Sequence, residues 1–199
     1  MTILKIGSIK TDDILKIIIE FLKKGGIIVC PTDTVYGFLA DVANKKAVEK
    51  IYKIKKRPRS KYLPVFVKDI KMAQELAEIN KDQEKILKKY WPGRFTFILF
   101  KKKSPDVRRR GTIYGVDKNT IALRIPKCKF LNDLLEKINR PLAQTSANIS
   151  GQPATTKIDD ILRQFSKADV LIIDAGDLTK SKPSKIIDLS SDREKVLRC

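Results

Sequence analysis

Residues 25–37 of the chain read Gly-Gly-Ile-Ile-Val-Cys-Pro-Thr-Asp-Thr-Val-Tyr-Gly. The apolar run 27–30 predicts a buried strand, and Pro31 prevents that strand from continuing as a paired one. Residues 31–37 then place two threonine hydroxyls, a carboxylate and a phenol at the strand end. Ligands bind beyond strand ends in α/β sheets, but the same side chains also cap a strand-to-helix turn. Taken alone, the stretch is compatible with both interpretations.

Working outward, the hydrophobic pattern alternates between helices and strands. One helix is expected to begin with an N-cap at Thr11–Asp13 and to stop at Gly25, and another runs from an Asn44 cap to a stop before Pro58. Further helices are predicted at 69–79, 81–90, 129–139 and 157–165, and strands at 63–67, 95–100, 120–126, 142–145, 170–174, 184–189 and 195–198. The last two strands are expected to close the sheet as a hairpin. This alternation predicts an α/β fold, as a single domain over residues 1–199.

Charge is the most unusual feature of the composition. The chain has 199 residues, with 42 Lys and Arg against 23 Asp and Glu, and a net charge of +19. This excess indicates anionic partners, either nucleic acid or a nucleotide, although a lysine-rich solvated surface explains part of it. The 42% hydrophobic content is typical of a globular protein and argues against disorder.

Several functional classes are disfavoured by what the sequence lacks. It contains no histidine, which excludes Ser-His-Asp and Cys-His catalysis and histidine-ligated metals. Cys30, Cys128 and Cys199 form no CxxC pair, so neither a disulfide framework nor a zinc site is expected. Neither a dinucleotide-binding GxGxxG nor a P-loop occurs. With no export signal or membrane span in the sequence, we expect a cytoplasmic protein.

Two basic clusters are candidates for binding anions. The first, Lys53–Lys61, could clamp a phosphate or carboxylate, or it could be a solvated helix end whose cations oppose the helix dipole. The second consists of Lys101–Lys103 and Arg108–Arg110, which flank a loop. These six cations could bind a polyanion, or they could be solvated.

Two further features point to buried polar chemistry. The strand at 120–126 places Thr120, Ala122 and Arg124 on one face, where an arginine is costly unless it is paired or binds a ligand. Residues 146–151 form a second small-polar loop after a strand, suited to an anion or to a hydrogen-bonded turn. Trp91 is expected to be a core residue or to plug a turn.

In their order along the chain, these motifs resemble the YrdC/TsaC family of threonylcarbamoyl-AMP synthases. The matching segments are GGIIVCPTDTVYG (25–37), KKRPRSKYL (55–63), WPGRFTF (91–97), TIALRIP (120–126), TSANISGQP (145–153), PSKIIDL (183–189) and VLR (196–198). The resemblance implies a twisted mixed sheet flanked by helices, with a basic concave cleft. It also implies condensation of L-threonine, bicarbonate and ATP, with pyrophosphate released and the adenylate passed to a partner transferase that modifies tRNA.

The resemblance further implies a role for each matching residue. Thr34, Arg124, Ser184 and Thr32 would bind L-threonine, with Arg124 on its carboxylate. Lys55, Arg57 and Lys61 would be the catalytic cations on the ATP phosphates. Thr120, Ser146, Asn148 and Arg198 would join Arg57 and Lys61 in binding the nucleotide, and Tyr36 would shape the pocket. Mg²⁺ would be held mainly by ATP phosphates, without a metal site of the protein's own.

Some positions depart from the family pattern, and other functions remain open. The departures are Phe38, Arg94, Ala154 and Lys185. An RNA-binding module, for double-stranded RNA or tRNA, could use the same basic face without catalysis. A carbamoyl-transfer domain of the kind fused into hydrogenase-maturation proteins is a third possibility. The enzyme interpretation needs no histidine, because the nucleophile would be an oxygen of the substrate.

Overall fold

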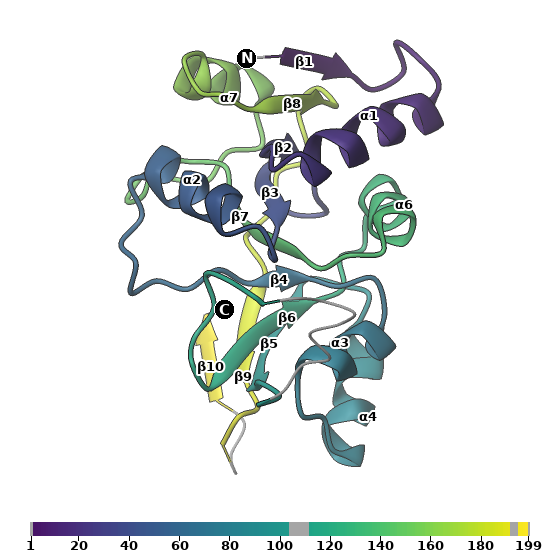
Figure 1. Cartoon of the computed structure of the whole chain (residues 1–199), viewed down its shortest axis with the longest axis vertical. Coiled ribbons are helices and arrows are strands. Elements are labelled where there is room, and N and C mark those ends of the chain that lie inside the picture. The colour runs from purple at the N-terminus through teal and green to yellow at the C-terminus, as the bar shows by residue number, and fades with distance from the viewer. Residues whose placement is uncertain (1, 104–111, 192–194, 199) are drawn as a thin grey trace.

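The computed structural model describes residues 2–103, 112–191 and 195–198, and within them the strands form one 10-stranded sheet (Figure 1). The strand order is β1-β8-β2-β3-β7-β4-β6-β5-β9-β10. The strands are β1 (Thr2–Lys5), β2 (Ile28–Cys30), β3 (Gly37–Asp41), β4 (Val65–Phe66), β5 (Phe95–Phe100), β6 (Thr120–Arg124), β7 (Leu142–Ser146), β8 (Leu171–Asp174), β9 (Lys185–Asp188) and β10 (Lys195–Arg198).

The sheet is mixed, as the resemblance implies. Parallel pairing joins β1 to β8, β8 to β2, β4 to β6 and β5 to β9. The remaining neighbours pair antiparallel, including the predicted closing hairpin of β9 and β10. The helices are α1 (Thr11–Lys23), α2 (Lys45–Lys55), α3 (Ile70–Leu76), α4 (Lys81–Tyr90), α6 (Lys129–Ile138) and α7 (Ile158–Phe165). Among the described residues, no helix is long and apolar enough to cross a bilayer.

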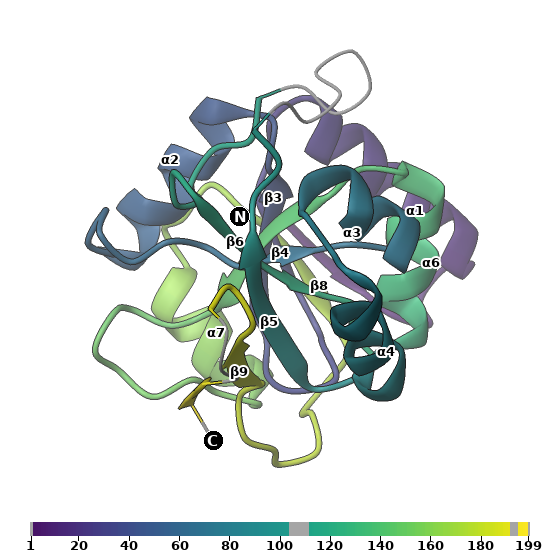
Figure 2. The same cartoon turned by 90° about the horizontal axis from the view of Figure 1, so that it is seen from below.

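Helices cover both faces of the sheet. Figures 1 and 2 show α1 and α6 together on one flank and α2 and α7 on the opposite flank. Side chains of β2 and β3 alternate between two cores: Ile28 and Leu39 pack with α1 and α6, whereas Val29 and Phe38 pack with α2 and α7. Every residue of β2 and β3 is buried, so apart from Asp41 at the end of β3 their sequences contain no polar residue and lack a period of two.

β3 is absent from the predicted elements because its apolar run covers only residues 38–40, which is too short to indicate a strand by itself. β3 pairs antiparallel with β2, so residues 31–36 connect two strands. The alternative of a strand-to-helix turn is therefore wrong. β3 also pairs with β7, with Gly37 opposite Ser146, and this pairing brings the two small-polar loops side by side.

Most other elements lie where the pattern predicts, with ends that match or are shifted by up to three residues. The Asn44 cap is confirmed, since its Oδ1 accepts a hydrogen bond from Ala47 N. The predicted side-chain cap at Thr11–Asp13 is wrong, because Lys10 occupies the N-cap position and makes no side-chain cap bond. Asp12 and Asp13 instead lie in the first turn, where their charges favour the helix dipole. Trp91 is a buried turn plug as expected, and its indole donates to Phe95 O at 2.8 Å.

Candidate functional site

A cavity of about 280 Å³ lies between the 31–36 loop, the face of β6, the end of β7 and the C-terminal hairpin. Three arginines and four hydroxyl residues from the predicted site line it: Arg57, Arg124, Arg198, Thr34, Thr120, Ser146 and Ser184. The predicted period of β6 is confirmed, because Thr120, Ala122 and Arg124 all face the cavity while Ile121 and Leu123 are buried in the core. The cavity thus gathers donors for an anion from six separate segments.

Arg124 is held in the cavity wall by a buried ion pair. Its Nη2 lies 2.6 Å from Asp33 Oδ1, with side-chain exposures of 2% and 7%, and its Nε donates to Gly93 O at 2.9 Å. Asp33 Oδ2 also accepts a hydrogen bond from Lys127 N at 3.1 Å. Burial lowers the pKa of Arg124, and the Asp33 charge opposes this shift. The cost of an arginine on this strand is therefore offset within the protein.

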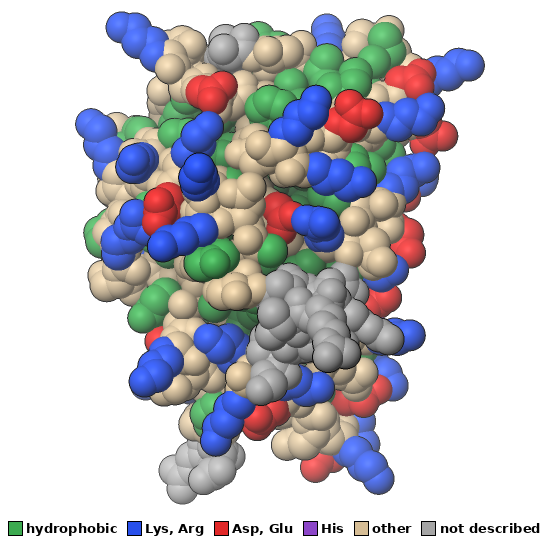
Figure 3. Space-filling view, viewed as in Figure 1, with side chains coloured by type: hydrophobic (Ala, Val, Ile, Leu, Met, Phe, Trp, Pro, Cys, Tyr) green, Lys and Arg blue, Asp and Glu red, His purple; other side chains and the backbone are tan. Residues whose placement is uncertain are grey.

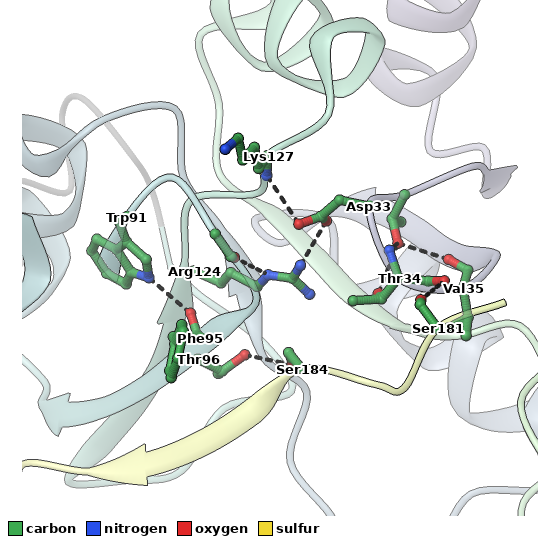
Figure 4. Close-up of polar contacts among 12 residues, drawn as sticks. Asp33, Thr34, Val35, Trp91, Phe95, Thr96, Arg124, Lys127, Ser181 and Ser184 are labelled. Carbon is green, nitrogen blue, oxygen red and sulfur yellow. Dashed lines mark hydrogen bonds and ion pairs between the residues drawn. The ribbon is translucent and has the colours of Figure 1, made fainter. Parts of the chain in front are cut away.

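The pairing leaves part of the guanidinium for a ligand. The described residues offer no hydrogen bond to Nη1, the third nitrogen. Figure 4 shows this nitrogen on the side of Thr34 and Ser184, away from Asp33. Arg124 can therefore meet Asp33 and a substrate carboxylate at the same time.

The C-terminal strand closes the cavity through Arg198. Its Nε and Nη2 donate to Ser184 O at 2.8 and 2.6 Å, and Nη2 also donates to Ser184 Oγ at 3.1 Å. Ser184 Oγ lies 3.0 Å from Thr96 Oγ1 in β5. Arg198 thus holds Ser184 in position through two guanidinium nitrogens, and its own side chain also lines the cavity.

Arg57 occupies the rim of the cavity beside the basic turn. Its Nε donates to Lys61 O at 2.8 Å and its Nη2 to Tyr62 O at 2.9 Å. Burial lowers the pKa of Arg57, and the nearby Arg198 lowers it further. Two arginine charges held this close favour an anion between them.

Lys55 lies behind the cavity. The residue is only 1% exposed. Its Nζ donates to Ser146 O, Asn148 O and Asn148 Oδ1 at 2.5, 2.7 and 3.1 Å. Asn148 in turn accepts from Ser146 Oγ at 2.6 Å and donates to Gln152 O at 2.5 Å. These three oxygen acceptors favour the charged ammonium, whereas burial disfavours it and lowers its pKa. Lys55 and Asn148 therefore shape the 146–152 loop from the side opposite the cavity.

Four predicted site residues lie outside the lining formed by the described residues: Thr32, Lys55, Lys61 and Asn148. Lys61 is exposed, and only its backbone carbonyl takes part in the contacts around Arg57. Tyr36 also lies behind the wall, where its hydroxyl donates to Gly176 O and burial raises its pKa to about 12. Direct contact of Thr32, Lys55, Lys61 or Asn148 with substrates remains a prediction.

Sequence reasoning missed three polar residues that organise the site. Asp33 pairs with Arg124, Ser181 Oγ donates to Thr34 O at 2.5 Å, and Asp117 lines the cavity. Asp117 Oδ1 accepts from Thr120 N and Thr120 Oγ1, and hydrogen bonds lower its pKa. The Asp-x-Asn-Thr spacing at 117–120 is typical of an Asx turn and could have revealed it. No local pattern indicates the contacts of Asp33 or Ser181 across 91 and 147 residues.

The second basic cluster is only partly described. Arg108–Arg110 lie outside the described residues, and Lys101 Nζ donates to Asp117 O at 3.0 Å. Figure 3 shows Lys and Arg side chains scattered over one face with acidic side chains among them. On this face the described cations do not gather into a single patch.

Replacing Lys55 with methionine is expected to flatten the pH dependence of stability. Burial, and then the charge of Arg57, lower the pKa of Lys55 from 10.5 to about 7. Between these values the unfolded chain binds a proton that the folded protein lacks. The free energy of unfolding of the wild type should then rise with pH, by at most about 1.4 kcal/mol per unit. Below about pH 7 both states are protonated, and the slope due to Lys55 disappears.

Thermal unfolding from pH 6 to pH 9 measures this effect. The control is Lys53→Met, which removes an exposed lysine from the same helix. A difference in Tm between wild type and Lys55→Met that stays constant over the range would contradict the assignment.

The fold and the cavity together define an α/β protein with a cavity lined by arginine and hydroxyl side chains. A sequence model of the family Sua5_yciO_yrdC, described as telomere recombination, matches residues 20–199. The chain therefore belongs to the Sua5/YciO/YrdC family, in agreement with the resemblance seen in the motifs.

Relatives with names and structures lie within this family. A putative threonylcarbamoyl-AMP synthase of Methanocaldococcus jannaschii is 38% identical over 196 residues, covering 96% of this chain and 89% of the relative. The threonylcarbamoyl-AMP synthase of Pyrococcus abyssi is 33% identical over 92% of this chain, which spans only 53% of that relative. The crystal structure of P. abyssi Sua5 with L-threonine superposes with a TM-score of 0.87 at 30% identity, covering 100% of this chain and 57% of that one. Escherichia coli YciO superposes with a TM-score of 0.84 at 26% identity, covering 99% and 93%.

Proposed function

We propose that this protein is a threonylcarbamoyl-AMP synthase, which condenses L-threonine, bicarbonate and ATP to threonylcarbamoyl-AMP and pyrophosphate. The observation that carries the proposal is the cavity, in which three arginines and four hydroxyl residues from distant segments converge. Relatives that bear this name, and a related structure with L-threonine, support it.

The chemistry asks for positioning and positive charge. The amino nitrogen of threonine and bicarbonate form a carbamate, with loss of water. A carbamate oxygen then attacks the α-phosphorus of ATP, and the bond to the bridging oxygen of the β-phosphate breaks to release pyrophosphate. Arginines that face the developing negative charge lower the barrier, and the reaction needs no general base from the protein because the nucleophile is the carbamate oxygen.

The geometry suggests how the cavity divides between the substrates. Thr34, Arg124 and Ser184 lie together near the 31–36 loop and would hold threonine, with its carboxylate on Arg124 (Figure 4). Arg57, Thr120, Ser146 and Arg198 would bind the nucleotide, and the two arginines would contact its phosphates. Lys55 and Asn148 would act through the loop that presents Ser146.

Mg²⁺ would enter with the nucleotide. No group of three or more His, Cys, Asp or Glu side chains suited to a metal occurs among the described residues. Oxygen atoms of Asp117, Thr120 and Ser146 line the cavity and fit a hard cation that is also bound by phosphate oxygens. The ion would neutralise phosphate charge, while the protein residues orient the two substrates.

A transferase that modifies tRNA would take up the adenylate in the cytoplasm, and RNA could contact the basic surface during that transfer. RNA binding without catalysis is the alternative function. The concave cavity favours the enzyme, since a module that reads an RNA backbone needs an extended basic surface.

Release of pyrophosphate by the purified protein tests the proposal. We expect release when ATP, L-threonine, bicarbonate and Mg²⁺ are all present, and only background release when threonine or bicarbonate is omitted. Undiminished release without threonine would refute the assignment, as would no release from folded protein with all four. Salt-dependent binding of tRNA in the latter case would instead support the RNA-binding alternative.

A further inference from the structure

Thr32 lies outside the cavity lining, yet its hydroxyl is the centre of a small hydrogen-bond network. Thr32 Oγ1 donates to Val35 O at 2.7 Å and accepts from Thr34 N at 3.0 Å. It also lies 2.9 Å from Thr34 Oγ1, a contact in which either hydroxyl could be the donor. Thr34, unlike Thr32, lines the cavity.

Counting protons decides the direction of the contact between the two hydroxyls. A hydroxyl has one proton and two lone pairs, and a carbonyl oxygen can only accept. The proton of Thr32 is already used on Val35 O. Thr34 Oγ1 must therefore donate its own proton to Thr32 Oγ1, which leaves only lone pairs of Thr34 for a ligand.

The position of Thr34 is held on both sides. Its backbone N–H donates to Thr32 Oγ1, and its carbonyl accepts from Ser181 Oγ at 2.5 Å. Its neighbour Asp33 is tied to Arg124 and to Lys127 N. Turning the Thr34 hydroxyl toward the cavity would break its bond to Thr32, so without a ligand the acceptor state is the more stable one.

We propose that Thr32 is a positioning residue that makes Thr34 Oγ1 a hydrogen-bond acceptor toward the ligand. The adjacent Arg124 guanidinium can only donate. The wall therefore presents an acceptor beside a donor, which matches a ligand that carries an O–H or N–H donor next to a carboxylate.

Resting on the proposed function, the inference specifies which atom of threonine meets Thr34. The amino nitrogen must stay free to bond the carbon of bicarbonate, and Arg124 takes the carboxylate. The side-chain hydroxyl of threonine is then the donor to Thr34 Oγ1. An ether of threonine lacks this proton, so the lone pairs of its ether oxygen would face the lone pairs of Thr34 Oγ1.

Equilibrium binding of three ligands tests the inference: L-threonine, O-methyl-L-threonine and L-2-aminobutyrate. In the wild type, L-threonine should bind about 10-fold or more tightly than the ether, as expected when an acceptor is left facing an acceptor. Thr32→Val retains the shape but frees the proton of Thr34, which can then donate to the ether. The ratio of the two Kd values should fall several-fold in Thr32→Val and return to the wild-type ratio in Thr32→Ser.

L-2-aminobutyrate separates this effect from general damage to the site. It has no side-chain oxygen, so Thr32→Val should change its Kd only to the extent that the substitution loosens the 31–36 loop. A purely structural role of Thr32 would weaken all three ligands by the same factor and leave the ratio unchanged, which would overturn the inference alone. If the wild type fails to bind L-threonine, both the inference and the proposed function fall.

Neutron diffraction on the wild-type protein provides a second measurement that needs no variant. It should place the Thr34 hydroxyl deuteron toward Thr32 Oγ1 and the Thr32 deuteron toward Val35 O. A Thr34 deuteron pointing into the cavity would overturn the inference even if threonine binds.

Discussion

Replacing Arg124 with alanine is expected to lower kcat/KM for L-threonine by at least about 100-fold, the factor that corresponds to losing a charged hydrogen bond together with the orientation it gives. Arg124 lines the cavity close to Thr34 and Ser184 (Figure 4), whereas the guanidinium of Arg198 is bonded to Ser184 O and Oγ. Without Arg124, the substrate carboxylate loses the guanidinium nitrogen that Asp33 and Gly93 O leave free. Initial rates of pyrophosphate release at varied threonine concentration measure the effect.

This variant also loses stability, and the two effects have to be separated. Removing Arg124 leaves Asp33 buried without its counterion, which costs roughly 3–5 kcal/mol in comparable buried pairs. Arg124→Lys keeps a positive charge for Asp33 but cannot reach Asp33, Gly93 O and a ligand together. The double variant Asp33→Asn, Arg124→Met removes both charges, so it should be more stable than Arg124→Ala.

The expected pattern is inactivity in all three variants with clearly different Tm values. Arg124→Lys or the double variant should remain folded at the assay temperature. Near-normal kcat/KM in either folded variant would show that Arg124 has only a structural role in pairing with Asp33.

Replacing Arg57 with alanine is expected to reduce kcat/KM for ATP by about 10- to 100-fold, as for the loss of one charge-assisted contact to phosphate. Affinity for L-threonine should change little, because the hydrogen bonds described for Arg57 go to Lys61 O and Tyr62 O and not to Thr34, Arg124 or Ser184. Stability should fall by only about 1 kcal/mol, since two hydrogen bonds to the carbonyls of Lys61 and Tyr62 are lost at a half-buried position.

The same turn offers a matched control in Arg59. Its side chain is 62% exposed, lies over the ring of Tyr52 and is 4.0 Å from Glu49, outside the cavity lining. Arg59→Ala removes the same charge at nearly the same position in the chain. If both variants reduce kcat/KM for ATP equally, the effect comes from the overall charge of the cluster, and a specific role of Arg57 in binding phosphate is refuted.

Much of the fold can be predicted from local pattern. The helices and most strands have the expected period and end signals, and the alternation of Thr120, Ala122 and Arg124 on one face of β6 is confirmed. β3 is missed because only Phe38, Leu39 and Ala40 of its five residues are apolar, a shorter run than the one that predicts β2. The error in the cap of α1 has a similar origin, since a cap-forming residue type does not show which residue starts the helix.

The sequence alone predicts an α/β fold, the family, and a group of polar motifs that includes seven of the residues in the cavity wall. The tertiary structure separates residues that face the cavity from residues that hold them. Thr34 and Arg124 face it, whereas Thr32, Asp33 and Lys55 lie behind and orient them or the neighbouring loop. Except for the local contact of Thr32, these are bonds between segments about 90 residues apart, and the direction of the Thr32–Thr34 bond follows from a third atom, Val35 O. Local periodicity does not reveal the long-range bonds, because they depend on how the sheet brings β3, β6 and β7 together. It does not reveal the direction of the Thr32–Thr34 bond either, because that direction depends on the conformation of the loop at residues 32–35.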